Sequence, residues 1–164
     1  MQTKLISAAA LLLAATLSHA ADGKKAAASI PDNTPILMQA EVGSLDKRVE
    51  VSYVCDSQQG KRNVNAMYGI KDGETAVVQI KVGDQVTPGL WRVMNDTNGK
   101  KQNSYYGEGL TWITDKASPD TLTKANGKIL MQASKLDGGL PKGDQTILFK
   151  DCKVDSAATK KLNK

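Results

Sequence analysis

The chain has 164 residues, which is room for one domain with an ordinary hydrophobic core. Charged residues make up 24% of the sequence and apolar residues 40%, a composition that excludes a largely disordered chain. The formal net charge is +5, but the lysines and arginines form separate doublets without the aromatic motif of an RNA-binding module. We therefore expect no nucleic acid partner.

The first twenty residues, 1–20, are typical of a secretory signal peptide. Lys4 supplies the positive start, an apolar stretch runs from Leu5 to Leu17, and small residues precede the expected cleavage after Ala20. An apolar run of about 13 residues is too short to span a bilayer, and no second run follows. The sequence therefore predicts an exported protein that does not span the membrane and that is located in the periplasm, at the outer-membrane surface or in the medium.

Residues 21–35 are small, polar and marked by prolines, so we expect 21–48 to be a largely flexible N-terminal extension with one short strand over 36–42. From Val49, apolar and polar residues alternate as they do in a half-buried strand. A turn at Gln58–Lys61 and a second alternating run over Val64–Tyr68 complete a predicted β-hairpin.

Further short strands are predicted along the rest of the chain, separated by turns rich in glycine, asparagine and aspartate. They lie at Ala76–Val82, Leu90–Met94, Leu110–Thr114, Lys128–Ala133 and Thr146–Cys152. Pro88 indicates that the second of these is an edge strand or begins late. Roughly seven or eight short strands without a helical apolar pattern predict an all-β domain over 49–153, an antiparallel barrel or sandwich. A charged tail follows over 154–164.

Two cysteines, Cys55 and Cys152, lie near the two ends of the strand-rich region. In a chain exported to an oxidising compartment such a pair is expected to form a disulfide, and the alternative is two buried free thiols. A crosslink that closes a loop of roughly 100 residues stabilises the fold by up to about 4.7 kcal/mol in the chain-entropy model. We therefore expect reduction to destabilise the protein rather than to abolish a reaction.

The only histidine, His19, leaves with the predicted signal peptide. Without an imidazole the exported chain cannot run a Ser-His-Asp or Cys-His mechanism, and it lacks the commonest zinc ligand. Ser44 and Lys47 match the spacing of an acylating S-x-x-K motif, but the stretch shows no helical core pattern and no companion motif. The acidic residues are scattered, so no pair of carboxylates has a fixed geometry for work on a sugar. The sequence predicts a protein that is not an enzyme and that holds no metal and no cofactor.

Residues 103–116 are denser in recognition-type side chains than any other segment. They include Tyr105, Tyr106 and Trp112, and these residue types give large contact areas for little lost side-chain entropy. The segment is therefore a candidate binding surface. The alternative is that Trp112 and one tyrosine are core residues that fill the end of a barrel.

Several motifs resemble those of one bacterial family. The similar segments are Val51–Cys55, Gln59–Lys61, Tyr68-Gly69, Tyr106-Gly107 and Ile147–Cys152. They resemble the adhesin complex proteins, which belong with the MliC-like inhibitors of C-type lysozyme, and the resemblance covers about residues 49–153. It implies a single antiparallel eight-stranded β-barrel with one disulfide. It also implies inhibition of host C-type lysozyme by loops inserted into the active-site cleft, and a further role as an adhesin on the host cell surface.

The resemblance also implies which residues bind lysozyme. In MliC-like proteins a serine just before a tyrosine turn and a lysine after a tryptophan strand carry the inhibition. Ser104, which precedes Tyr106, and Lys116, which follows Trp112, hold these places here, and Tyr105 completes the predicted set.

A hypothesis from a different class stays open beside this one, namely a periplasmic or envelope β-barrel that binds a small ligand. It predicts a concave apolar interior, whereas the inhibitor hypothesis predicts a filled core and a protruding loop around 103–118. The sequence leaves the oligomeric state open.

Overall fold

The structure, a computed structural model, describes residues 39, 40 and 42–164. The predicted signal peptide, its cleavage after Ala20 and the predicted extension up to residue 38 lie outside the described residues. Of the short strand predicted over 36–42, the described part holds an isolated antiparallel bridge between Gln39 and Val93. Within the described part of the chain, no helix has the length and hydropathy needed to cross a membrane.

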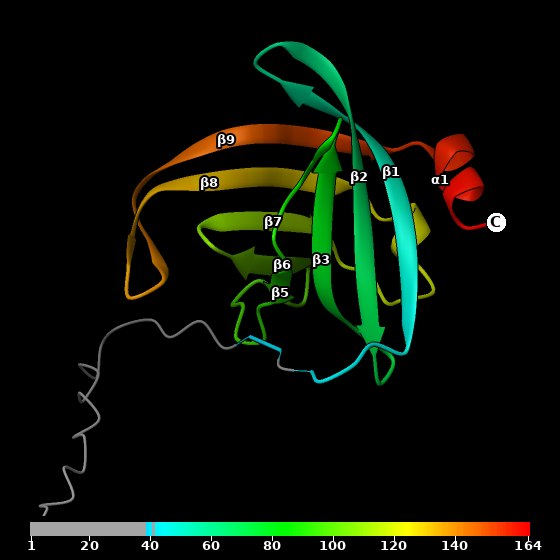
Figure 1. The fold of residues 1–164 in the computed structure, drawn as a ribbon, viewed down its shortest axis with the longest axis horizontal. Helices are drawn as coiled ribbons and strands as arrows, with labels where there is room; N and C mark the ends of the chain where they lie inside the picture. Colours follow the sequence, from blue (N-terminus) through cyan, green and yellow to red (C-terminus); the bar gives the residue numbers. More distant parts are fainter. Residues whose placement is uncertain (1–38, 41) are drawn as a thin grey trace, which may run out of the picture. The chain divides into compact units, whose positions relative to one another are not determined.

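The described residues form β-strands, one short 3-10 helix and one α-helix (Figure 1). The strands are β1 (Lys47–Ser57), β2 (Gly60–Lys71), β3 (Glu74–Val82), β4 (Gln85–Val86), β5 (Leu90–Arg92), β6 (Gln102–Gly107), β7 (Leu110–Asp115), β8 (Gly127–Asp137) and β9 (Leu140–Val154). The 3-10 helix η1 covers Leu122–Lys124 between β7 and β8, and α1 covers Ser156–Leu162 after β9.

The sheet closes on itself. Antiparallel neighbours follow the order β2-β1-β9-β8-β7-β6-β5-β3, and β3 also pairs with β2 from Asn65 opposite Lys81 to Lys71 opposite Glu74. Eight strands therefore form a ring, while β4 pairs only with the end of β3 and stays outside it. The predicted all-β fold, a single antiparallel eight-stranded barrel, is confirmed.

The β1–β2 hairpin shows how alternation along the strands builds the core. Val51 and Tyr53 on β1 lie opposite Ala66 and Val64 on β2, and all four side chains are fully buried. This is the pairing that the alternating sequence predicts for two strands with one face toward a core. The predicted hairpin is confirmed. The strand predicted behind Pro88 does begin late, at Leu90.

The sequence pattern does not predict β6. Asn103, Ser104, Tyr105 and Tyr106 are four successive buried residues, so the strand lacks the alternation that marks one buried face. Both faces are covered, because the hydroxyl of Tyr106 donates to the carbonyl oxygen of Gly139 in the β8–β9 turn at 2.5 Å. A strand covered on both faces looks, in sequence, like an irregular segment of mixed residues.

Helix α1 docks on the outer face of β1 through hydrogen bonds, and Figure 1 shows it beside that strand. The carboxylate of Asp155 caps its first turn by accepting from the amide of Ala158 at 2.9 Å. The buried hydroxyl of Thr159 accepts from the backbone amide of Ser52 on β1 at 2.9 Å. The charged tail predicted over 154–164 thus contains a helix. Its sequence does not indicate one, because the contacts that hold it are polar and leave no apolar stripe.

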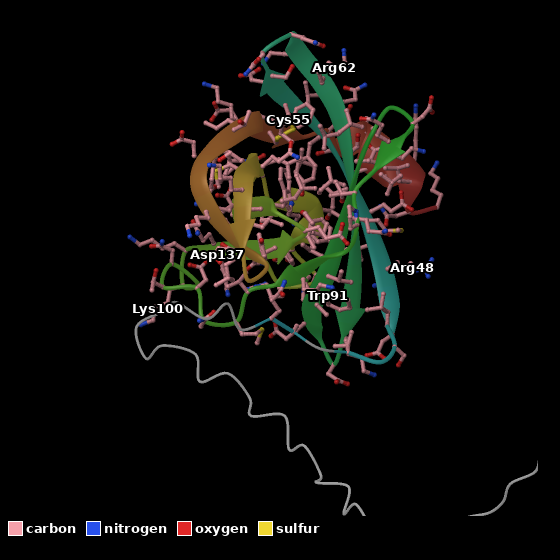
Figure 2. The ribbon with its side chains drawn as sticks, turned by 60° about the vertical axis from the view of Figure 1, so that its left-hand side comes forward. Arg48, Cys55, Arg62, Trp91, Lys100 and Asp137 are labelled. Carbon is pink, nitrogen blue, oxygen red and sulfur yellow. A yellow bond between two sulfur atoms is a disulfide. The ribbon has the colours of Figure 1, made fainter. Side chains whose placement is uncertain are left out.

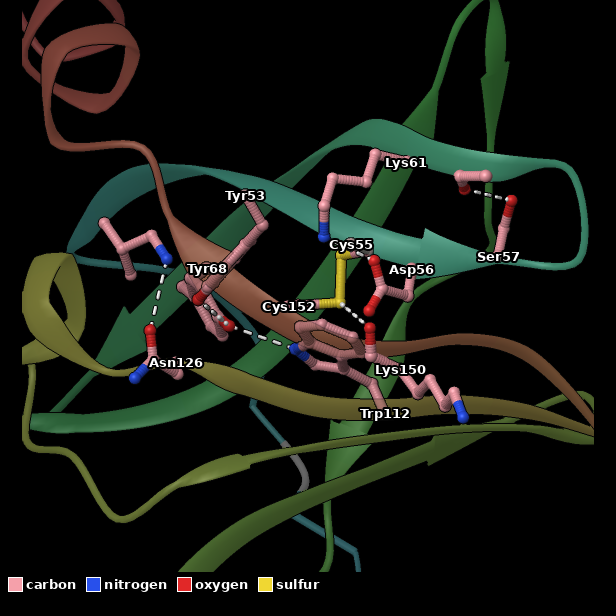
Figure 3. The surroundings of a disulfide bond; sticks show 12 residues. Tyr53, Cys55, Asp56, Ser57, Lys61, Tyr68, Trp112, Asn126, Lys150 and Cys152 are labelled. Carbon is pink, nitrogen blue, oxygen red and sulfur yellow. Dashed lines mark hydrogen bonds and ion pairs between the residues drawn. A yellow bond between two sulfur atoms is a disulfide. The ribbon is translucent and has the colours of Figure 1, made fainter.

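A disulfide joins Cys55 on β1 to Cys152 on β9, across a separation of 97 residues (Figure 3). The two strands are neighbours in the barrel, and both cysteines are fully buried. The predicted pairing is confirmed and the alternative of two free thiols is excluded. The crosslink fastens the last strand of the barrel to the first.

Candidate functional site

The aromatic residues of segment 103–116 lie on two faces of the barrel wall. Trp112 and Tyr105 point inward and are fully buried. The indole nitrogen of Trp112 donates to the hydroxyl of Tyr68 at 3.0 Å, and that hydroxyl lies 3.0 Å from the hydroxyl of Tyr53 (Figure 3). The hydroxyl of Tyr105 donates to Oγ1 of Thr75 at 2.8 Å. In this structure Trp112 and Tyr105 therefore fill the barrel and offer no surface to a partner.

These buried tyrosines are structural rather than reactive. Desolvation is the main reason that the pKa values of Tyr53, Tyr68 and Tyr105 are raised above the ordinary value of tyrosine. The three phenols consequently stay protonated and serve as neutral donors and acceptors within the core. Each hydroxyl has a hydrogen-bond partner, as buried polar groups in stable proteins do.

Tyr106 lies on the outer face of β6 but is covered. Its side chain is 5% exposed, and its hydroxyl is bound to Gly139 at the tip of the β8–β9 hairpin. The side-chain amide of Gln39 donates to the backbone carbonyl oxygen of Tyr106 at 2.5 Å. Tyr106 therefore connects β6 by hydrogen bonds to Gly139 at the tip of the β8–β9 hairpin and to Gln39.

Ser104 is bound to Asp96, which lies in the loop between β5 and β6. The hydroxyl of Ser104 donates to the Asp96 carboxylate, which also accepts from the side chain of Gln102 at 3.2 Å and from the backbone amide of Asn98 at 2.7 Å. Partial burial works against the charged form of Asp96, but these hydrogen bonds outweigh it and lower the pKa of the carboxyl group. Ser104 itself is 7% exposed. Its hydroxyl holds the loop in place and is not presented to solvent.

Lys116 follows the last residue of β7 and is exposed. Among the described residues it has no ion-pair partner. Its position is fixed by the next residue, Ala117, which is buried and whose carbonyl oxygen accepts from the side-chain amide of Asn103 at 2.8 Å. Asn103 precedes Ser104 on β6. These two successive residues hold two loops: Asn103 binds Ala117 in the loop after β7, and Ser104 binds Asp96 in the loop before β6.

The loops 93–101 and 116–126 leave the barrel at the same end, because Gln102 pairs with Asp115 across β6 and β7. We call this the loop end. Four exposed lysines of these two loops have no ion-pair partner within the part of the chain that the structure describes, namely Lys100, Lys101, Lys116 and Lys124. Figure 2 shows Lys100 on the outside of its loop. The loop end is thus a basic surface that is held by internal hydrogen bonds.

The opposite end of the barrel is open, and we call it the mouth. A cavity of about 800 Å³ lies there, with Arg62 among its lining residues. Its apolar lining includes Ile80, Val82, Leu110, Leu130, Leu148 and Phe149. The prediction of a protruding loop around 103–118 is wrong, because most of this segment forms the barrel strands β6 and β7. The barrel is filled around Trp112, as the inhibitor hypothesis predicts, and hollow at the mouth, as the small-ligand hypothesis predicts.

The sequence patterns do not reveal Asp96 and Asn103, the two residues that anchor the loop end. The turn-forming residues around Asn98-Gly99 predict a loop, but nothing in them shows that Asp96 reaches Ser104. Asn103 looks like a polar loop residue, although it is fully buried. Both roles depend on contacts between strands and loops that only the folded barrel creates.

The fold and the site define the chain as a small antiparallel β-barrel protein fastened by a disulfide. The family model described as an ACP-like domain matches residues 49–154, and the chain belongs to this family, as its motifs indicated. Among solved structures, the Adhesin Complex Protein from Neisseria meningitidis is similar to it, with 24% sequence identity over 65% of this chain and 99% of that chain and a TM-score of 0.48. No curated protein matches the chain.

Proposed function

We propose that the protein is a non-enzymatic, exported inhibitor of host C-type lysozyme that acts through the loop end of the barrel. Membership of the ACP-like family supports this proposal. The observation that carries it is the state of Lys116. This lysine is exposed and has no ion-pair partner among the described residues. Its loop is held in place by the hydrogen bond from the side-chain amide of Asn103 to the carbonyl oxygen of Ala117.

The chemistry of the target matches this lysine. Lysozyme hydrolyses its substrate with two carboxyl groups, one a general acid and the other a nucleophile or stabiliser. A lysine ammonium that enters such a cleft forms a charge-assisted hydrogen bond with a carboxylate, and water is excluded around the pair. Lys116 has no ion pair with another described residue to break before it binds. The loop then occupies the catalytic position without offering a bond to cleave.

The other predicted residues support the loop end from within. Ser104 holds loop 93–101 through Asp96, and Trp112 and Tyr105 fill the barrel behind β6 and β7. Tyr106 fastens the outer face of β6. Loops that are rigid before binding lose less conformational entropy when they bind, which favours affinity.

Charge sets the kinetics of the proposed complex. C-type lysozymes are basic, and the exported chain, which lacks Lys4 after cleavage behind Ala20, has a formal net charge of +4 instead of the +5 of the full sequence. Two positive proteins gain nothing from long-range steering, so the association is not accelerated by electrostatics. The affinity has to come from local complementarity between the loop end and the cleft.

The proposal is tested by the rate at which a C-type lysozyme lyses peptidoglycan in the presence of increasing amounts of the disulfide-bonded protein. We expect saturable inhibition that approaches one inhibitor per enzyme. A peptidoglycan amidase serves as the control, because a protein that only masks the substrate slows both enzymes. Full lysozyme activity at a large molar excess of the protein would overturn the proposal.

We propose a location at the outer-membrane surface or in the periplasm, and a second role in adhesion to host cells. The predicted signal peptide supports the location, and membership of the ACP-like family supports the role in adhesion. N-terminal sequencing of the exported protein is expected to begin at Ala21, and the purified protein is expected to bind host cells saturably. An unprocessed N-terminus, or binding no greater than that of an unrelated basic protein, would contradict these two points.

A further inference from the structure

The mouth of the barrel, at the opposite end from the proposed lysozyme site, has the features of a ligand-binding site. We propose that it binds a fatty acid, with the acyl chain inside the cavity and the carboxylate at Arg62. This inference is independent of lysozyme inhibition and takes up the small-ligand hypothesis that the sequence left open.

The cavity is a continuation of the barrel interior. On β3, the lining residues Ile80 and Val82 lie on the same, inward face as the buried Val78. On β7, the lining residue Leu110 lies two residues before the buried Trp112 and therefore on the same, inward face. Inward-facing positions of several strands therefore line the space, as in barrels that hold one small ligand. Its volume of about 800 Å³ lies within the range of roughly 300–1,000 Å³ that is usual for such sites.

The apolar lining extends to the rim. Ile80 and Leu130 are almost fully buried at the inner side, whereas Val86 is 54% exposed and Ile147 is 45% exposed. Large apolar side chains that gather around a concave opening leave unfavourable contacts with water. An acyl chain that enters the mouth removes these surfaces from water along its whole length.

The charge of the mouth fits one carboxylate. Arg62 is the only ionisable residue among the described residues that line the cavity, and it has no ion-pair partner within the described chain. Arg62 lies two residues before the buried Val64 on β2, so both side chains are on the inward face of that strand. Figure 2 shows Arg62 near the end of the barrel. The neighbouring cation, Lys61, is already paired with Asp56 at 2.6 Å. A guanidinium group can bind a carboxylate with two parallel hydrogen bonds.

The remaining lining residues are uncharged. Gln58, Gln59 and Gln85 supply amide groups, and no carboxylate of the described residues lines the cavity to repel an anion. One cation beside one apolar cavity matches a ligand with one negative charge and one chain.

The experiment is calorimetric titration of the disulfide-bonded protein with tetradecanoate below its micelle concentration. We expect saturable binding of one molecule per chain. Decanoate is expected to bind at least tenfold more weakly, because four methylene groups fewer are buried. Tetradecanol, which has the same chain and no charge, is expected to bind several-fold more weakly. An absence of saturable binding of tetradecanoate would overturn the proposal.

Three variants locate the site. Gln132→Trp places a large side chain at an exposed lining position and is expected to abolish binding of tetradecanoate without lowering the melting temperature or the inhibition of lysozyme. Arg62→Gln is expected to make tetradecanoate and tetradecanol bind equally. Arg48→Gln, on β1 far from the mouth, is the control and is expected to change neither affinity (Figure 2). Unchanged binding by Gln132→Trp, or an unchanged preference for the acid in Arg62→Gln, contradicts the assignment.

Discussion

Trp112 occupies the space that a side chain at Gly127 would need. A β-carbon on Gly127 would lie 2.6 Å from Cζ2 of the indole, nearer still to Cη2, and 2.9 Å from Cβ of Cys152. Gly127 pairs with Cys152 across β8 and β9, so the indole, the glycine and the disulfide are packed against one another. A glycine is therefore required at position 127 for the indole to fill this half of the barrel.

Replacing this glycine tests that packing. We expect Gly127→Ala to lower the free energy of unfolding by about 1–3 kcal/mol, because the added methyl group overpacks the core. The measurement is denaturant unfolding followed by tryptophan fluorescence. Gly43→Ala is the control, since no atom of the described residues lies within 4 Å of a β-carbon there, and it is expected to change stability by less than about 0.5 kcal/mol. Equal effects of the two substitutions would show that Trp112 does not fill this space.

The disulfide between Cys55 and Cys152 is expected to contribute to stability and not to reactivity. We expect the double variant Cys55→Ala, Cys152→Ala to lose about 2–5 kcal/mol of unfolding free energy, because the crosslink restricts a long loop in the unfolded chain. Denaturant unfolding with and without a reducing agent measures this. The reducing agent should lower the unfolding midpoint of the wild-type protein and leave the midpoint of the double variant unchanged. Unfolding midpoints of the wild-type protein that do not change on reduction would contradict the expectation.

The strands and the disulfide could be predicted from the sequence because each leaves a local signal. Val51 and Tyr53 alternate with polar residues, and each turn carries glycine, asparagine or aspartate. Strand β6 left no such signal, because the turn at Gly139 and Gln39, which help to cover its outer face, lie 33 and 67 residues from Tyr106 in the sequence. Local patterns cannot report a contact of this kind.

The candidate site was harder to predict. Ser104 and Lys116 do reach the same end of the barrel, which follows from the pairing of β6 with β7. The burial of Trp112 and Tyr105 could not be read from their residue types, because tryptophan and tyrosine are common both in binding surfaces and in cores. The mouth cavity depends on how the strands close around Ile80 and Leu130, and an alternating pattern looks the same in a filled and in a hollow barrel.

The contact between Asp96 and Ser104 predicts a pH dependence of stability. The folded protein lowers the pKa of the Asp96 carboxyl group, so the charged carboxylate stabilises the fold above the unfolded pKa of about 3.9. That contribution is lost as the pH falls through the lower, folded pKa. We expect the stability difference between the wild-type protein and Asp96→Asn to be constant near neutral pH and to shrink below about pH 4.

The measurement is the unfolding midpoint as a function of pH. Asp120→Asn is the control, because Asp120 is exposed and has no hydrogen bond or ion pair among the described residues. A difference for Asp96→Asn that stays the same from pH 7 to pH 3 would mean that the carboxylate does not hold the loop by its charge.

Lys116 is expected to dominate the inhibition of lysozyme. We expect Lys116→Ala to weaken inhibition at least tenfold, because removing one partner of a desolvated charge pair leaves the other charge buried and unpaired. Lys81→Ala is the matched control, since Lys81 is exposed on β3 and has no ion-pair partner in the described part of the chain. The inhibition constants of both variants, with melting temperatures to confirm folding, provide the test. Equal inhibition by the two variants would remove Lys116 from the site.

The central claim is that the loop end enters the active-site cleft of lysozyme. The most direct measurement is the affinity of the protein for a C-type lysozyme with and without a saturating peptidoglycan oligosaccharide that the enzyme binds but does not cleave. If Lys116 and its loop occupy the cleft, the two ligands compete, and the apparent Kd rises in proportion to the oligosaccharide concentration. An apparent Kd that the oligosaccharide leaves unchanged would contradict the claim.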